Sequence, residues 1–405
     1  MSPSEKLIIK KQILIVYQAP WDWSFLWNRS RPLAKALSLH ADVIYLNHGT
    51  KYFKINKIAT YLLPILPDRI RKQILRTRNY GSSLGINLKN WIWEDASPNP
   101  WLLAMRDREK KDYSKLANYI RQVAPKYSEV WLLSSRPQAQ LLESLYPWDK
   151  FILDIEDPWF DLSWGVAETR QCLLSSIKKA NIVFANGPNL ATEYCSIAQR
   201  PVMSLPNGVD ASFLECLKKV NPEPTFYVPR HNQIRAVFTG NINDRLDFRI
   251  LQRITDVQEY FFYFIGQENI PNMYASLWNT IKNKSNVRWV SQIPHSEIPA
   301  VLQHADVLLV PYFSMGHDKM FPAKLFEYAA ACKPIISTMD FSGGSIFIPS
   351  MNIASDEEAL CHKLAEIHQT NASLSGKTID NCRRLASENT WDARAKEFIS
   401  VVQSS

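Results

Sequence analysis

The stretch 321-FPAKLFEYAAACKPIIST-338 contains a helix and a buried strand, and this combination decides the fold class. Pro322 suits the first position of a helix, where its missing N–H would have no partner in any case, and the residues after it are mostly strong helix formers. Lys333 and Pro334 end that helix, and IIST has the length and apolar character of a short buried strand. Because another apolar run, 306-DVLLVPY-312, precedes the stretch, the local pattern is strand, loop, helix, strand.

Lys324 and Glu327 lie three residues apart on this helix, so their side chains project from the same face. The free N–H groups at a helix N-terminus favour an anion, and Lys324 adds a full positive charge beside them. A carboxylate one turn deeper accepts hydrogen bonds from a diol such as a ribose. The pair predicts a nucleoside diphosphate site. The alternative is an exposed ion pair that contributes about 0.2–0.5 kcal/mol.

Apolar runs alternate with helical patterns in both halves of the chain. The runs with strand character are 12–17, 42–46, 129–133, 151–155, 181–185, 234–240, 260–266, 287–290, 306–312 and 334–338. The helical patterns of the first half are 31–39, 113–123, 137–146, 167–179 and 188–198. Because strands that alternate with helices form parallel sheets covered on both faces, we expect an α/β protein with two Rossmann-like domains.

The domain boundary is expected at the polar, proline-rich stretch 211–232, which has no clear period. The first domain then covers 1–210 and the second covers 211–387. A C-terminal helix follows at 388–405, and packing of this helix back on the first domain is one expectation.

The composition is that of an ordinary globular protein, with 46% hydrophobic and 21% charged residues among 405. The six cysteines form no C-x-x-C pair and have no zinc-type histidine spacing, so neither a metal site nor a disulfide framework is expected. The chain starts without the long apolar region of a signal peptide, and it has no apolar run of 18 residues that would span a membrane. We therefore expect a cytoplasmic protein. The net charge is +8, but there is no nucleic-acid motif, so we expect no nucleic-acid partner.

The segment 51–80 carries much of the positive charge around the apolar centre YLLPILP, with Asp68 as its one acid. Basic flanks around an apolar centre are typical of a segment that lies on an anionic membrane surface. The alternative, which the pattern supports equally, is a pair of solvated helices packed on the domain by their apolar residues.

Ligands of parallel α/β sheets bind at the loops beyond the carboxyl ends of the strands. The first such loop, 17-YQAPWDWSFLWNRSRP-32, has aromatic and basic groups instead of G-x-G-x-x-G, which argues against NAD or FAD. The loop 239-TGNINDRLDF-248 places Gly240 where the backbone can approach a ligand closely, and Arg245 where it can reach a phosphate.

The loop 154-DIEDPWFD-161 concentrates four carboxylates directly after a strand. Crowded carboxylates raise one another's pKa, and this makes Asp157 a candidate general base, with Asp154 and Asp161 as its neighbours. The alternative is a helix cap, because Asp157 before Pro158 is also a good N-cap followed by proline at the first helical position.

In their order along the chain, five stretches resemble GT-B-fold glycosyltransferases, those grouped with the glycosyl transferases 1 and 4. They are 206-PNGVD-210, 239-TGN-241, 306-DVLLVPY-312, 322-PAKLFEYAAACKPIIST-338 and 389-NTWDARAKEFI-399. The nearest likeness is to bacterial enzymes that build exopolysaccharide or teichuronic acid, and it covers most of the chain. The resemblance implies a GT-B fold, in which the parallel sheets of two Rossmann-like domains face a central cleft.

The resemblance also implies roles for particular residues. Glu327 takes the place of the family's ribose-binding glutamate, and Lys324 that of a lysine near the diphosphate. In the family's common E-x7-E pair the first glutamate touches the donor sugar, but here that position is Lys319. The expected donor-binding residues are Gly240, Asn241, Arg245, Lys319, Met320, Phe321, Lys324 and Glu327. The expected acceptor-binding residues are Trp21, Trp23 and Arg29.

The function that these features predict is transfer of a sugar from a nucleotide-sugar, with UDP as the expected nucleotide, to a lipid-linked or glycan acceptor in polysaccharide biosynthesis. Asp157 is the expected catalytic base of an inverting transfer. No metal and no cofactor are expected, because the nucleotide-sugar is a substrate and the helix start with its basic side chains stabilises the leaving diphosphate. The alternatives are a nucleotide-sugar 2-epimerase and a catalytically silent glycan-binding or partner-binding protein, which Lys319 favours.

Overall fold

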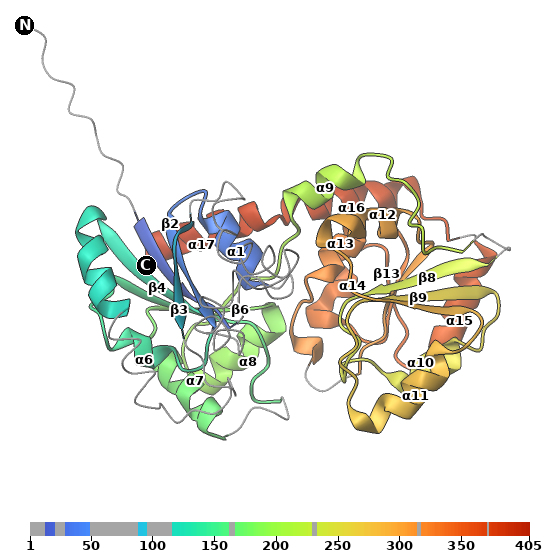
Figure 1. Ribbon diagram of the computed structural model, residues 1–405, viewed down its shortest axis with the longest axis horizontal. Coiled ribbons are helices and arrows are strands. Elements are labelled where there is room, and N and C mark those ends of the chain that lie inside the picture. Colours follow the sequence, from blue (N-terminus) through green and yellow to red (C-terminus); the bar gives the residue numbers. More distant parts are fainter. Residues whose placement is uncertain are drawn as a thin grey trace, which may run out of the picture. The chain divides into compact units, whose positions relative to one another are not determined.

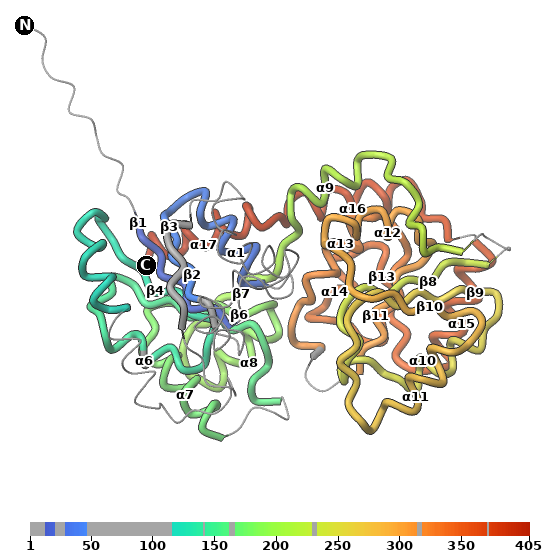
Figure 2. Tube along the Cα trace, viewed as in Figure 1, coloured from blue at the N-terminus to red at the C-terminus, as the bar shows by residue number. Residues whose placement is uncertain are grey.

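The computed structural model describes residues 13–20, 29–48, 88–94, 116–161, 167–228, 233–313, 317–370 and 372–405. The chain divides into two compact units. The first consists of Met1–Asn186, Ala191–Leu205 and Ala395–Ser405, and the second of Gly187–Leu190 and Pro206–Arg394. The path of the chain through each unit can be followed in Figure 2.

This division differs from the boundaries expected from the sequence at Gly187–Leu190, which counts with the second unit, and at two further places. The segment 206–210 counts with the second unit, because Val209 exchanges backbone hydrogen bonds with Asn389 (2.9 Å) and Trp391 (3.1 Å). Helix α17 (Trp391–Ser404) begins in the second unit and ends in the first. There the ring of Phe398 packs against that of Phe184, with ring centroids 5.3 Å apart.

The first unit contains a parallel sheet of seven strands in the order β3-β2-β1-β4-β5-β6-β7. Its strands are β1 (Ile13–Gln18), β2 (Asp42–His48), β3 (Leu88–Glu94), β4 (Glu129–Ser134), β5 (Lys150–Ile155), β6 (Ile182–Ala185) and β7 (Met203–Ser204). Strands β3 and β7 were not expected. Strands β1 and β6 are buried along their whole length, as their continuous apolar runs require.

Helices cover both faces of this sheet, with α1 and α17 on one face and α6, α7 and α8 on the other (Figure 1). Besides α17, their bounds are α1 (Ser30–Leu37), α6 (Ala139–Glu143), α7 (Ala167–Lys179) and α8 (Pro188–Ala198). Residues 116–123 are also helical and lead into the 3-10 helix η1 (Ala124–Lys126).

The second unit contains a parallel sheet of six strands in the order β10-β9-β8-β11-β12-β13. Its strands are β8 (Ile234–Thr239), β9 (Tyr260–Ile265), β10 (Val287–Val290), β11 (Val307–Val310), β12 (Ile335–Ser337) and β13 (Met351–Ile353). Numbered within the unit, the order is the 3-2-1-4-5-6 of doubly wound nucleotide-binding folds.

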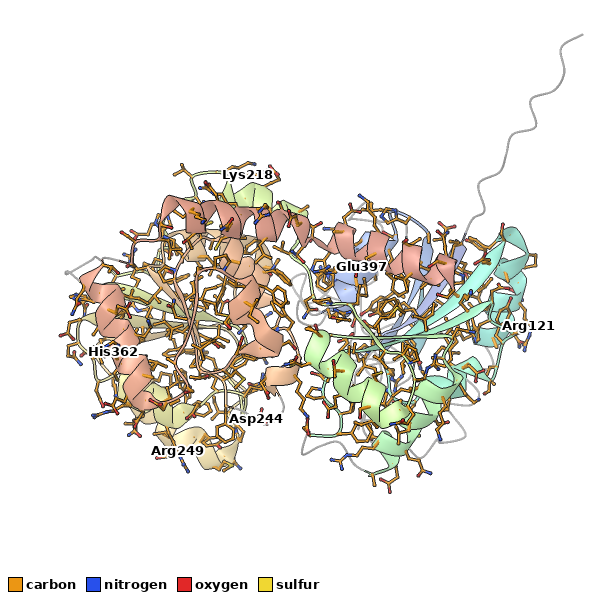
Figure 3. All side chains as sticks on the ribbon, turned by 180° about the vertical axis from the view of Figure 1, so that it is seen from behind. Arg121, Lys218, Asp244, Arg249, His362 and Glu397 are labelled. Atoms are coloured by element: carbon orange, nitrogen blue, oxygen red, sulfur yellow. The ribbon has the colours of Figure 1, made fainter. Side chains whose placement is uncertain are left out.

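Two layers of helices also cover the second sheet (Figure 1). One layer consists of α9 (Ala211–Leu217), α12 (Ile298–Gln303), α13 (Lys324–Ala330) and α16 (Gly376–Glu388), and the other of α10 (Phe248–Ile254), α11 (Asn272–Lys282) and α15 (Glu357–Gln369). Figure 3 shows Lys218, beside α9, and His362, on α15, on opposite sides of this sheet. Successive residues of a strand point to opposite faces of the sheet and so belong to two separate hydrophobic cores. On β8, Val237 packs in one core and Phe238 in the other.

Four short helices complete the loops of this unit: η2 (His295–Glu297), η3 (His317–Lys319), η4 (Phe341–Gly343) and α14 (Gly344–Phe347). The sequence predicted that this helix begins at Pro322, but α13 begins at Lys324. Leu325 bonds to the carbonyl of Pro322 (3.1 Å) and Phe326 to that of Ala323 (3.3 Å). These i to i+3 bonds form a tighter turn ahead of the α-helix, so Pro322 belongs to that turn.

Among the described residues, no helix has both the length and the apolar character needed to cross a membrane. The same part of the chain contains no group of three or more His, Cys, Asp or Glu side chains arranged to hold a metal ion.

Candidate functional site

The strand order of the second unit reverses between β8 and β11, and open α/β sheets bind ligands beyond the carboxyl ends of their strands at such a point. The ammonium group of Lys324 lies there. Its Nζ donates a hydrogen bond to the carbonyl of Thr239, the last residue of β8, at 2.7 Å. The same Nζ is 4.0 Å from the ring centroid of Phe238 on β8 and 4.9 Å from that of Tyr312, just after β11. The fold therefore holds a positive charge at the switch point.

Gly240 and Gly266 make room for this arrangement. Gly240 has φ +135°, and a Cβ on it would come within 2.7 Å of Lys324 Nζ. Gly266 has φ +151°, and a Cβ there would lie 2.0 Å from the carbonyl oxygen of Gly240. Lys324 and the loop after β9 therefore both approach Gly240 closely, whereas the approach of a ligand to this backbone stays a prediction.

Glu327, one turn into α13, has only 9% of its surface exposed. Its Oε1 lies 2.7 Å from Nε2 of His295, a residue that belongs to η2 and that no motif of the sequence singled out. The ring of His295 packs against that of Phe213 on α9, with centroids 5.3 Å apart. The structure therefore gives the predicted ribose-binding carboxylate a polar neighbour 32 residues away along the chain.

The remaining predicted donor-binding residues lie on the loops after β8 and β11. The half-buried residues Asn241 and Arg245 belong to the first loop, and the carbonyl of Arg245 accepts a hydrogen bond from the N–H of Phe313 at 2.7 Å, which ties the two loops together. Lys319, also half-buried, ends η3, and its carbonyl accepts a hydrogen bond from the hydroxyl of Ser342.

Met320 and Phe321 are buried, with 7% and 3% of their surface exposed. The ring of Phe321 packs against that of Phe326, with ring centroids 4.8 Å apart. The backbone carbonyl of Phe321 accepts a hydrogen bond from Nδ2 of Asn207 at 2.6 Å. Phe321 therefore belongs to the core that also contains Leu325 and Phe326 of α13.

In the first unit, Arg29 is held by a buried ion pair. Its Nε and Nη2 each donate to a carboxylate oxygen of Asp154 at 2.8 Å, and Nη2 also donates to the carbonyl of Leu205 at 2.8 Å. Arg29 is 5% exposed and Asp154 1%. The residue predicted to bind the acceptor therefore joins α1 to the end of β5, whereas Trp21 and Trp23 lie outside the described residues.

Asp157 lies in a turn at the carboxyl end of β5. The N–H of Trp159 donates to the carbonyl of Asp157 at 2.9 Å, and Asp161 bonds in the same way to Pro158 at 2.9 Å. Residues 158–161, which follow Asp157 in the described part of the chain, form turns and no helix, so the alternative of a helix that begins at Pro158 is wrong. The side chain is half-buried, and its role as a base stays a prediction.

Crowded carboxylates act on Glu156, which no feature of the sequence singled out. Glu156 is 8% exposed, and its Oε1 accepts a hydrogen bond from the hydroxyl of Ser30 at 2.9 Å. Burial, with further contributions from Asp154 and Asp157, raises its pKa to about 8 against the opposing effects of Arg29 and Ser30. Burial is the largest cause, and the sequence alone does not reveal which carboxylate of the loop is buried.

The raised pKa of Glu156 predicts a pH-dependent stability. Between an unfolded-state pKa of about 4.3 and the folded-state pKa of about 8, the folded protein keeps a proton that the unfolded chain has lost. The free energy of unfolding therefore falls as the pH rises through this window and levels off above it. Removing the ionisable group with Glu156→Gln should reduce this fall.

Melting temperatures of the wild type and Glu156→Gln between pH 5 and pH 9 check this expectation, with Glu358→Gln on the exposed face of α15 as the control. As the pH rises to about 8, the melting temperature of the wild type should fall relative to that of Glu156→Gln. If the difference in melting temperature between the wild type and Glu156→Gln stays constant across this range, the pKa of Glu156 is not raised in the folded protein.

Comparisons with known proteins agree with this architecture. Residues 233–369 match the family described as Glycosyl transferases group 1. Over 216 residues, 50% of this chain, the sequence is 26% identical to a Bacillus subtilis (strain 168) protein named as the teichuronic acid biosynthesis glycosyltransferase TuaH. The aligned part spans 53% of that relative, about half its length.

Solved structures resemble the whole chain at low sequence identity. Sucrose-phosphate synthase from Thermosynechococcus elongatus superposes with a TM-score of 0.67 at 13% identity, covering 97% of this chain and 99% of that one. Anabaena HepE, solved in complex with UDP-glucose, gives a TM-score of 0.64 at 10% identity, covering 98% and 100%. The fold class is therefore GT-B, and this prediction is confirmed.

The resemblance to the glycosyl transferases group 1 is confirmed as well. The second unit carries the matched segment, and that segment includes β8, β11, Lys324 and Glu327. The class predicted from the sequence, a glycosyltransferase, is the class of this family and of the relative in Bacillus subtilis.

Proposed function

We propose that this protein is a glycosyltransferase that moves a sugar from a nucleoside diphosphate sugar, with UDP as the nucleotide, to an acceptor hydroxyl. The observation that carries the proposal is the position of Lys324 at the switch point of the second sheet, with Glu327 on the same helix. The HepE complex with UDP-glucose, which has the same fold, supports the choice of nucleotide.

In this reaction a bond forms between the acceptor oxygen and C1 of the sugar, and the bond from C1 to the diphosphate oxygen breaks. The leaving diphosphate takes the electron pair of that bond. Lys324 and Arg245 neutralise the charge that develops on it, and Glu327 accepts hydrogen bonds from the ribose diol. Asp157, at the carboxyl end of β5, takes the proton of the acceptor hydroxyl.

The acceptor that we propose is a lipid-linked or growing glycan, and the process is polysaccharide biosynthesis. The relative named for teichuronic acid biosynthesis supports this choice. Trp21 and Trp23 are proposed to contact the acceptor, because aromatic side chains combine a large apolar face with a polar edge.

A second candidate is a silent binding protein that keeps the fold without turnover. The observation that favours it is Lys319, which stands where the family's sugar-contacting glutamate is expected. An enzyme releases the nucleotide from its donor, whereas a binding protein retains the nucleotide-sugar intact, so nucleotide release separates the two.

The experiment that tests the proposal is a thermal-shift screen with UDP, GDP, ADP and their sugar conjugates, followed by assays of nucleotide release. A ligand at a hundred times its dissociation constant stabilises a fold by about 2.7 kcal/mol, which is readily measured. Stabilisation by UDP and UDP-sugars is the expected result. If no nucleotide shifts the melting temperature, the second unit does not bind a nucleotide-sugar and the proposal fails.

We also propose attachment to an anionic membrane surface through the segment 51–80, which lies outside the described residues. Each basic residue near such a surface contributes about 1 kcal/mol, and salt screens the attraction. The protein should therefore float with vesicles that contain anionic lipid at low salt and less so at high salt. Absence from the vesicle fraction under both conditions would rule this attachment out.

A further inference from the structure

Glu327 is the predicted ribose-binding group, and its side chain is 12% exposed. A glutamate has three side-chain torsions, and the last of them is broad, so burial alone does not fix the direction of its oxygens. A ligand with two adjacent hydroxyls binds well only if that direction is set beforehand. The described residues that can set it are those within hydrogen-bond distance of the carboxylate.

His295 is placed to do this. Its Nε2 lies 2.7 Å from Oε1 of Glu327, which is the distance of a charge-assisted hydrogen bond. Because this contact uses one carboxylate oxygen, Oε2 keeps its acceptor capacity for a ligand.

His295 is itself held by its surroundings. It opens η2, which leads directly into α12, and its carbonyl accepts the backbone N–H of Ile298. Its ring packs against Phe213, which is 3% exposed and belongs to the core beneath α9 and α13. The imidazole of His295 thus contacts both α9, through Phe213, and α13, through Glu327. It cannot turn away from Glu327 without also losing its contact with Phe213.

We propose that His295 is a positioning residue for donor binding, which orients the carboxylate of Glu327 so that its second oxygen meets the ribose diol of the nucleotide. This inference rests on the proposed function. It assigns His295 no contact with the reacting atoms, and its effect reaches the donor only through Glu327.

The contact can instead serve the fold alone, as a tie between η2 and α13. The two roles differ in what they change. Loss of a tie lowers the melting temperature without a specific loss of donor affinity. Loss of positioning raises the KM for the donor and the dissociation constant for UDP, with a much smaller change in kcat, because the ribose is bound equally before and during the reaction.

The test compares His295→Ala, His295→Gln and the control His362→Ala, an exposed histidine on the opposite side of the same sheet (Figure 3). UDP binding is measured by titration calorimetry, and donor KM and kcat by nucleotide release. His295→Ala should weaken UDP binding about tenfold, because a carboxylate that is no longer held in place loses part of its hydrogen bonding to the ribose. His295→Gln, which keeps an N–H donor, should recover part of this loss, and His362→Ala should change nothing.

A double-mutant cycle completes the test. If His295 acts through Glu327, then adding His295→Ala to Glu327→Ala should weaken UDP binding no further. Unchanged UDP affinity in His295→Ala, or a full second loss in the double variant, would overturn the positioning role while the proposed function stands. If the wild type binds no nucleotide, the proposed function fails first and this inference fails with it.

Discussion

Asp157→Asn is expected to lower the rate of sugar transfer about 10²–10⁴-fold, the range that a general base contributes. Asparagine has nearly the same shape as aspartate, but it cannot take a proton from the acceptor hydroxyl. The turn at Asp157 uses its backbone carbonyl, which accepts from Trp159 at 2.9 Å, and the variant keeps this bond. The melting temperature should therefore stay unchanged.

The measurement is the turnover of Asp157→Asn with a donor identified in the nucleotide screen and an acceptor glycan. Asp380→Asn is the matched control, because Asp380 lies on the exposed face of α16 and is not proposed to act in the reaction. Since no helix begins at Asp157, a loss of rate cannot be assigned to a lost helix cap. Wild-type rates in Asp157→Asn would mean that another group accepts the proton.

Lys324→Met and Glu327→Ala are expected to weaken UDP binding about 10–100-fold each, because a hydrogen bond to a charged group contributes about 1.5–3 kcal/mol. Methionine is chosen because it has a similar length and no charge, so that the change removes mainly the ammonium group beside Phe238 and Tyr312. Alanine at 327 removes the carboxylate together with its bond to His295.

UDP titrations of these variants and of Lys218→Ala check the expectation. Lys218 follows α9 at the surface (Figure 3), so its loss should leave binding unchanged. If both Lys324→Met and Glu327→Ala bind UDP as the wild type does, the nucleotide site lies elsewhere. A drop in melting temperature without a change in affinity would assign both residues to the fold.

The fold class followed from the sequence because its signal is local. Buried parallel strands are short continuous apolar runs, and each of the ten predicted runs contains an observed strand or overlaps with one. Helices α7 and α8 also span the ranges that their patterns predicted, 167–179 and 188–198. Three strands were missed: β7 and β13 have only two and three residues, and β3 (Leu88–Glu94) mixes charged and polar residues with its apolar ones, so it forms no continuous apolar run.

The sequence also predicted that Lys324 and Glu327 lie on the same face of one helix. Residues three apart share a helix face whatever the rest of the chain does. By itself the sequence thus determined the class, the alternation of strands and helices, and the two charged side chains of α13. These features depend on residues that are close together along the chain.

The tertiary structure decided the surroundings of the site. It buried Glu156 next to Asp154 and so raised the pKa of a carboxylate that the spacing did not distinguish from its neighbours. It brought His295 to Glu327 across 32 residues and Arg29 to Asp154 across 125. The physical reason is that burial and long-range hydrogen bonds depend on strand order and helix packing, which the whole chain sets together, whereas a local pattern reports only which residues share a face.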